Sequence, residues 1–262
     1  MALRNDGPWG SPGGLAVIDV RNPRLPRQLG AVDIGHVSRG LAVAGNYAYI
    51  SGDTGTTGGL SVIDIRDPHN PSVVGSVTSP EIAYGLAVSE SHAFVAVRSA
   101  YPYVYSLKVF DVSTPALPLL VGSVDVPYGA YSVALSGDYA FVLGGYLQVV
   151  DVSNPLAPGL VSVAYAPGAT GNFGGVTIQG DIAYAAKDRS VEVIDISDPT
   201  HPRFVGSAPS GGGAVAVSGD YLCAGAGLRG LLILPTQCQP WEKDGPIRGH
   251  ASDVENAEVE DR

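Results

Sequence analysis

Tyrosine and arginine are the side chains of this 262-residue chain whose placement most suggests chemistry, since these two residues build the strongest contact points of binding surfaces. Many of the 13 tyrosines lie in segments that read as connections between strands, and arginines accompany them. We therefore expect a non-enzymatic site that binds a protein, a peptide or a glycan. Its candidate residues are Arg39, Tyr84, Tyr131, Arg98, Tyr101, Tyr103, Tyr128 and His36.

A second hypothesis is an enzyme, such as a hydrolase or lyase acting on a polysaccharide, which would use carboxylates of the same connections. Those carboxylates are Asp33, Asp53, Glu81 and Asp125. A pair of them about 5–10 Å apart would suit glycoside cleavage. The five histidines are scattered without metal-ligand spacing, and no nucleophile elbow or phosphate loop appears. We expect no catalytic motif, no metal and no cofactor.

Charge and composition limit the partners. The chain has a net charge of −10, and the segment 242–262 alone holds seven acidic and three basic residues. An acidic chain without a basic cluster is a poor ligand for nucleic acid or for anionic lipid. The chain contains no run of 18 apolar residues, which a membrane-spanning helix would need, so we expect no insertion into membranes. We also expect a monomer.

The elements that position these residues come from an internal repeat. An aspartate that follows an apolar run and precedes a proline by four positions recurs at intervals of 45, 47, 40 and 44 residues. Such an aspartate suits a turn, because its carboxylate can accept backbone N–H groups two residues on. We therefore assign a structural turn role to Asp19, Asp64, Asp111, Asp151 and Asp195.

Each repeat also contains a short Val-Gly-Ser-Val type strand and a hairpin. The hairpin has Gly-Asn or Gly-Asp at its centre, as at Gly45 and Gly137, except in the second copy, which has Glu90-Ser91. Four short strands per unit of about 40–47 residues are typical of a propeller blade. The sequence predicts an all-β propeller of about five four-stranded blades with almost no helix. A ring of six blades, or an incomplete ring cut from a longer propeller, remains an alternative.

Propeller geometry then gathers the candidate residues. We name the strands of a blade A to D from the inside outward. The D-to-A and B-to-C connections share one face, around the mouth of the channel, and nearly all the tyrosines and arginines considered above fall in them. Arg39, Tyr84 and Tyr131 occupy one column just before strand A. The aromatic column formed by Tyr49, Phe94, Phe141 and Tyr184 is interpreted instead as packing between blades.

The recurring Leu-x-Val-Ile-Asp-Val/Ile-Ser-Asp/Asn-Pro segment resembles the LVIVD-repeat proteins, over about residues 14–235. The resemblance implies a β-propeller, mostly of bacterial and archaeal surface or secreted proteins, and it supplies no catalytic residue. It also leaves open a purely structural segment of a larger surface protein. Residues 1–14 lack the apolar run of a signal peptide, so the compartment stays undecided.

The ends of the chain are expected to be irregular. We divide it into a flexible segment 1–13, a propeller 14–240 and an acidic, disordered tail 241–262. The strand count is 21, one more than five closed blades need. Closure could add residues 28–32 to the last three strands, or Leu15 to Val20 could displace Leu231 to Leu234. Cys223 and Cys238 could pair or remain as thiols.

Overall fold

The computed structural model describes residues 2–3, 13–165, 173–187, 190–210, 213–225 and 230–236. This part of the chain contains 22 β-strands and no helix. The strands form six antiparallel sheets, which we call blades 1 to 6 in chain order. The predicted all-β propeller architecture is therefore confirmed.

The first three blades are built from eleven strands. Blade 1 has β1 (Ala2–Leu3), β2 (Gly14–Asp19) and β3 (Arg27–Asp33). Blade 2 has β4 (Val37–Ala44), β5 (Tyr47–Asp53), β6 (Gly58–Asp64) and β7 (Ser72–Ser79). Blade 3 has β8 (Ile82–Val88), β9 (His92–Arg98), β10 (Tyr105–Asp111) and β11 (Leu119–Asp125).

The other three blades repeat the plan, and blade 6 has three strands. Blade 4 has β12 (Ser132–Ser136), β13 (Tyr139–Leu143), β14 (Leu147–Asp151) and β15 (Gly159–Ala164). Blade 5 has β16 (Phe173–Gln179), β17 (Ile182–Lys187), β18 (Ser190–Asp195) and β19 (Arg203–Pro209). Blade 6 has β20 (Val215–Ser218), β21 (Tyr221–Gly225) and β22 (Leu231–Pro235).

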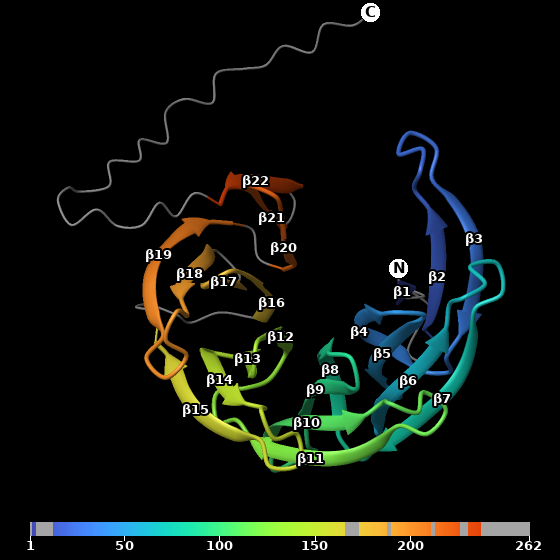
Figure 1. Cartoon of the computed structure of the whole chain (residues 1–262), viewed down its shortest axis with the longest axis horizontal. Coiled ribbons are helices and arrows are strands. Elements are labelled where there is room, and N and C mark those ends of the chain that lie inside the picture. The colour runs from blue at the N-terminus through green and yellow to red at the C-terminus, as the bar shows by residue number, and fades with distance from the viewer. Residues whose placement is uncertain are drawn as a thin grey trace, which may run out of the picture.

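The blades stand side by side around a ring (Figure 1). Strands β4, β8, β12, β16 and β20 line its centre, and β3, β7, β11, β15 and β19 form its outer rim. Four of the five described A-to-B hairpins turn at a glycine with positive φ, such as Gly45 (55°) and Gly137 (54°), and the hairpin of blade 3 has Glu90-Ser91 instead. The four-strand units and their order from inside to outside thus follow the sequence repeat.

The hydrophobic core lies between blades rather than within them. Five clusters of buried side chains each join two successive blades. In β5, Tyr49 packs toward blade 3, whereas Ala48 and Ile50 pack toward blade 1. Phe141 joins blades 4 and 5 and is 1% exposed. Burial of such an aromatic side chain contributes roughly 1.5–3 kcal/mol, so stacking of neighbours stabilises the fold.

The ring is open between blades 1 and 6 in Figure 1. Strand β3 pairs with β2, and β22 pairs with β21. Neither expected closure is present: residues 28–32 do not join the last three strands, and Leu15 to Val20 do not replace Leu231 to Leu234. Within the described ranges, no strand pairing bridges the first and last blades.

Two further expectations fall largely outside the described residues. Within 1–13 the structure describes Ala2–Leu3, which pair with β2, and Gly13. The segment 241–262 lies outside the described residues, as does Cys238. Cys223 in β21 is half-buried and has no disulfide partner in the part of the chain described.

Candidate functional site

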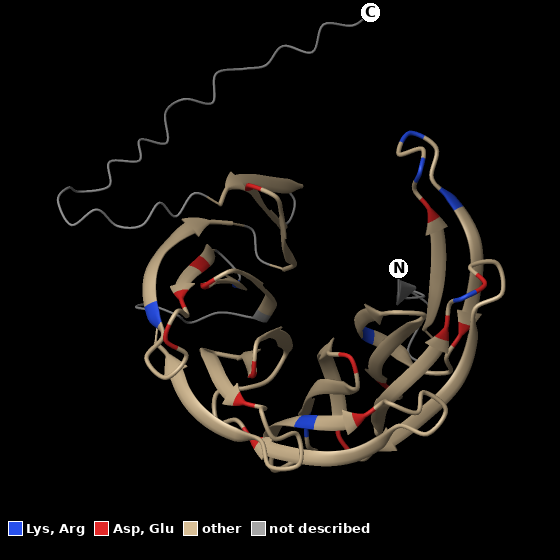
Figure 2. Cartoon of the chain, viewed as in Figure 1, with Lys and Arg blue, Asp and Glu red and all other residues tan. Residues whose placement is uncertain are grey.

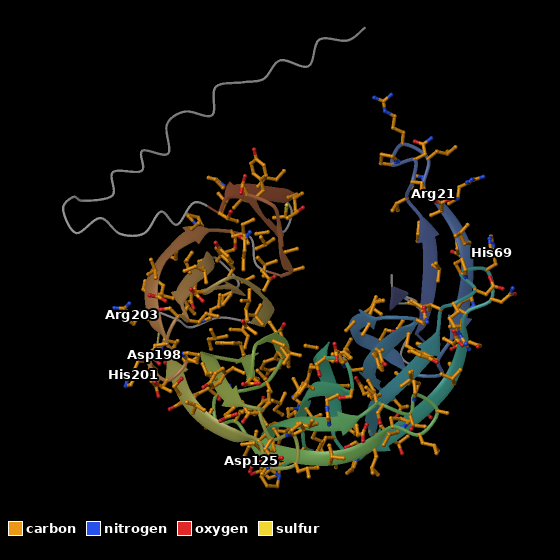
Figure 3. All side chains as sticks on the ribbon, in the orientation of Figure 1. Arg21, His69, Asp125, Asp198, His201 and Arg203 are labelled. Atoms are coloured by element: carbon orange, nitrogen blue, oxygen red, sulfur yellow. The ribbon has the colours of Figure 1, made fainter. Side chains whose placement is uncertain are left out.

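The repeated aspartates lie at the turns that leave each third strand. Each carboxylate accepts the backbone N–H two residues on, at 3.0 Å from Arg21 to Asp19 and 2.8 Å from Ser113 to Asp111. The same contact occurs at Asp64, Asp151 and Asp195. Side-chain hydrogen bonds from the same residues, and then these backbone hydrogen bonds, lower the pKa of the aspartate carboxyls. Figure 3 places Arg21 and Arg203, which pair with two of them, on the outer side of the ring.

The inner strands bring the predicted tyrosine column together through the backbone. Gly85 in β8 donates its N–H to the carbonyl of Tyr131 at 2.9 Å. A Cβ on Gly85 would come within 2.7 Å of that carbonyl oxygen, so this close approach requires glycine. The neighbouring Tyr84 therefore lies beside Tyr131, with ring centroids 5.0 Å apart at 65°.

Tyr105, at the start of β10, completes this group, which we call the inner aromatic cluster (Tyr84, Tyr105 and Tyr131). Its ring lies 5.6 Å from that of Tyr131, and the two hydroxyls are hydrogen-bonded at 2.8 Å. Burial, followed by the hydrogen bond with Tyr105, raises the pKa of Tyr131. The phenol of Tyr131 therefore remains neutral at physiological pH, and the three rings offer hydrogen-bonding and stacking groups.

Two guanidinium groups approach the ring of Tyr84. The Cζ atom of Arg39 lies 5.2 Å from the ring centroid, and that of Arg98 lies 5.9 Å from it. Arg39 pairs with the buried carboxylate of Asp53. Arg98 is in no ion pair within the described residues, and its buried Nε atom has no hydrogen-bond acceptor there. This nitrogen is the one buried side-chain polar atom without a partner in the described structure.

The β9–β10 connection extends the site outward. Arg98 stacks on Tyr103, with Cζ 4.6 Å from the ring centroid, and Tyr103 meets Tyr101 edge to face at 6.0 Å. The hydroxyl of Ser99 holds the loop, since it donates to the carbonyl of Pro102 and accepts the N–H of Val104. Tyr101 and Tyr103 are 87% and 60% exposed, so their rings are accessible.

A second aromatic cluster (Tyr128, Tyr146 and Tyr165) lies next along the ring. The ring centroids are 4.8 to 5.9 Å apart, and the hydroxyls of Tyr128 and Tyr165 lie 3.0 Å apart. The buried amide of Gln148 fixes the loop, because it accepts the N–H of Tyr128 and donates to the carbonyl of Gly129. Lys187 lies 5.8 Å above the ring of Tyr146.

Tyr146 is a residue that the sequence reasoning missed. It sits in the B-to-C connection of blade 4, which is short, so it reads as part of the following strand. Its position in the column of Tyr101 and Tyr103 is the signal that could have identified it. Asp188, Arg189 and Arg229 occupy other B-to-C connections and lie outside the described residues.

His36 does not join the tyrosines and arginines. Its Nε2 lies 2.9 Å from the hydroxyl of Ser61, and its Nδ1 lies 3.2 Å from the carbonyl of Val37. Both His36 and Ser61 line a separate cavity of about 230 Å³ on the β5–β6 side of blade 2, with Asp53. Six of the eight predicted ligand residues therefore touch one another, Tyr128 belongs to the second cluster, and His36 stands apart.

The candidate carboxylates are engaged in local contacts. Asp33 accepts the N–H of Gly35 at 2.8 Å, and Asp125 accepts the hydroxyl of Ser106 at 2.8 Å. Glu81 pairs with Lys108 at 2.6 Å. Burial raises the pKa of Glu81, but hydrogen bonds from Lys108 and Ser79 outweigh it and lower the pKa overall. Figure 3 shows Asp125 at the rim of the ring, away from the central strands.

Charges are sparse around the ring. In Figure 2 the basic positions are few on the other blades, and several gather on the hairpin between β2 and β3. Within the same residues, no group of three or more metal-ligating side chains occurs. The described chain also holds no helix with the length and apolar character of a membrane span.

Comparisons with known proteins bear on the fold. A family model described as LVIVD repeat matches residues 35–79, 82–126, 129–164, 170–209 and 212–234. No curated protein sequence matches the chain. A crystal structure of a functionally unknown protein from Desulfotomaculum acetoxidans DSM 771 is similar in fold, with a TM-score of 0.63 and 13% identity. The match covers 79% of this chain and 66% of that one, slightly under two thirds.

Proposed function

This chain belongs to the LVIVD repeat family, and from that premise we propose that it is a non-enzymatic binding scaffold. Its ligand would be a protein, a peptide or a glycan held on the tyrosine and arginine face at the mouth of the ring. The observation that carries the proposal is the continuous contact from Arg39 through Tyr84, Arg98 and Tyr103 to Tyr101.

The arrangement supports binding for a physical reason. Stacked aromatic rings and guanidinium groups lose little conformational freedom when a ligand arrives, because their neighbours already fix their orientation. The inner cluster is half-buried and rigid, and the exposed rings of Tyr101 and Tyr103 lie beside it. Rigid aromatic residues next to arginine are the composition of binding hot spots. The loops that carry them rest on a rigid sheet scaffold.

A polysaccharide hydrolase or lyase has less support. Such an enzyme needs a carboxyl group with a raised pKa as general acid, positioned near a second carboxylate. Glu81 has a lowered pKa, and Asp53 is committed to Arg39. Every carboxyl group of the described residues with a clearly shifted pKa has a lowered one, so the face offers binding groups more readily than acid–base groups.

The test begins with the whole chain on an array of peptides and glycans. Any ligand found is then measured against the double variant Tyr101→Ala/Tyr103→Ala by titration calorimetry. These two rings are mostly exposed, so their removal should leave the fold intact while weakening binding by about tenfold or more.

The matched control is Tyr221→Ala. Tyr221 is similarly exposed, at 57%, but begins β21 at the opposite end of its blade from the B-to-C connections. It should bind the ligand like the unmodified chain. Retention of every array ligand by the triple variant Arg39→Ala/Tyr84→Ala/Tyr131→Ala would remove this site from consideration. An empty array would favour a purely structural segment of a larger surface protein.

A further inference from the structure

We propose that Arg98 anchors a carboxylate carried by the ligand, and that the ligand is an acidic glycan containing uronic acid residues. This inference rests on the binding face proposed above and specifies its chemistry. It starts from the buried Nε of Arg98, which has no acceptor within the described residues. A buried donor without a partner is rare in folded proteins and is often completed by an ion or another bound group.

The charges around Tyr84 support an anionic ligand. Two guanidinium groups lie near the same ring, and one carboxylate, that of Asp53, accompanies them. The sum of +1 for Arg39, +1 for Arg98 and −1 for Asp53 leaves one positive charge uncompensated. The other cations of this face differ, since Lys108 pairs with Glu81 and Lys187 with Glu192. One negative charge on the ligand would neutralise this remaining positive charge.

The stacking of Arg98 prepares it for a planar anion. Its guanidinium lies over the ring of Tyr103 at 4.6 Å and near Tyr84 at 5.9 Å, so aromatic faces hold its orientation. A guanidinium oriented in this way can present two parallel N–H groups to the two oxygens of a carboxylate. Such paired, charge-assisted hydrogen bonds are stronger and more directional than a contact with a lysine ammonium group.

The exposed rings favour a sugar as the carrier of that carboxylate. Tyr101 and Tyr103 are largely open to solvent beside Arg98. The face of an aromatic ring carries partial negative charge, so it attracts polarised C–H groups. A pyranose ring presents several such C–H groups on one face. The cavity of blade 2 lies elsewhere, since His36 and Asp53 line it and Arg98 does not.

The experiment measures tetragalacturonate binding to the full chain by titration calorimetry at low and moderate salt. The fully methyl-esterified tetramer keeps the sugar rings but removes the carboxylates. We expect the acid to bind at least about tenfold more tightly than the ester, and the difference to shrink as salt rises. This comparison needs no variant, so it does not depend on the folding of a mutant.

Variants then locate the contact. Arg98→Gln should abolish the preference for the acid over the ester, and Arg98→Lys should restore only part of it because lysine lacks the planar fork. The matched control is Arg27→Gln, at the start of β3, which removes an exposed arginine that also lies in no ion pair among the described residues. Thermal unfolding of each variant is followed in parallel.

Several outcomes would overturn the inference. Equal binding of acid and ester, both lost in Tyr101→Ala/Tyr103→Ala, would leave the binding face standing and refute the anion contact. Acid binding that survives Arg98→Gln would move the contact elsewhere. Tighter binding of a glutamate-rich peptide than of the uronate would refute the glycan as the ligand. Tighter binding of a sulfated tetrasaccharide would refute the carboxylate as the anion that Arg98 binds. Absence of binding by every probe would refute the inference as a whole.

Discussion

At the scale of single residues, Asp111 illustrates how one carboxylate repeated in every blade ends a strand. Hydrogen bonds from Ser113 hold the pKa of Asp111 below its usual range. A carboxyl whose pKa is lower in the folded state than in the unfolded state stabilises the fold above the unfolded pKa. This contribution is lost as pH falls through the folded pKa. The same sign applies to Asp64, Asp151 and Asp195.

We therefore predict that the free energy of unfolding falls as pH drops below about 4, where unfolded aspartates begin to take up protons. Urea unfolding at a series of pH values measures this effect. Asp111→Asn keeps an acceptor oxygen but does not titrate, so its stability should depend less steeply on pH. A variant profile parallel to that of the unmodified chain would contradict the assignment of Asp111 to this acid dependence.

The residue scale also shows how far sequence reasoning can reach the site. Arg39, Tyr84 and Tyr131 occupy one column of the repeat, and the structure places Tyr84 in contact with both of the others. Such a column is predictable because the same position of the repeat recurs in every blade. The direction of a loop side chain is not predictable in this way. His36 points toward Ser61 because the turn before it has a positive φ at Gly35.

At the scale of elements, a glycine in the outer strands of blades 2 and 3 is the point where the next blade docks, whereas blade 4 has Val161 at this position. A Cβ on Gly75 would lie 2.2 Å from the carbonyl oxygen of Pro115, and one on Gly122 would lie 2.1 Å from that of Pro155. In both cases the neighbour is the aspartate–proline turn of the following blade. Gly206 of blade 5 has no atom within 4 Å of its Cβ position. Blade 6 replaces the aspartate by Pro235.

This difference between equivalent glycines leads to a prediction. Gly122→Ala should destabilise the fold by about 1–3 kcal/mol, because the added methyl group must displace the backbone of the next turn. Gly206→Ala, at the same position of the repeat, should be nearly neutral. Urea unfolding of the two variants measures both effects. Equal losses at the two positions would show that the strand, rather than the docking of the next blade, requires glycine.

The glycine column also marks what the sequence leaves undetermined at this scale. The Val-Gly-Ser pattern predicts a strand correctly, as in β7 and β11. The glycine of this pattern is required because the strand contacts a turn about 40 residues later. The sequence of the strand alone does not show that contact. The two expected closures were wrong because each needed a pairing between the two ends of the chain, whereas β3 pairs with its sequence neighbour β2 and β22 pairs with β21.

At the scale of the whole molecule, each blade is stabilised by the apolar side chains it buries against its neighbours. Each core cluster joins two successive blades, so the inner blades have two neighbours. Blade 6 packs on blade 5 alone through Leu222, Ala224 and their surroundings, in the described part of the chain. A chain of units with nearest-neighbour contacts opens most easily at its ends.

We accordingly expect the amide hydrogens of β20, β21 and β22 to exchange at least about tenfold faster than those of β13 and β14. Hydrogen–deuterium exchange followed by mass spectrometry resolves these segments. The matched comparison is β9 in blade 3, which should resemble β13. Uniform protection across all six blades would instead indicate a single cooperative unit, in which the open ring has no weaker end.

The docking of a turn against a glycine has an evolutionary consequence. Blades 2 and 3 each carry the aspartate–proline turn on one flank and a closely approached outer-strand glycine on the other, so both halves of the joint between two units are encoded within a single unit. Duplication of that stretch of gene copies both halves of the joint at once. A new unit can thus dock on the old one before any residue has changed, and its loops are then free to diverge.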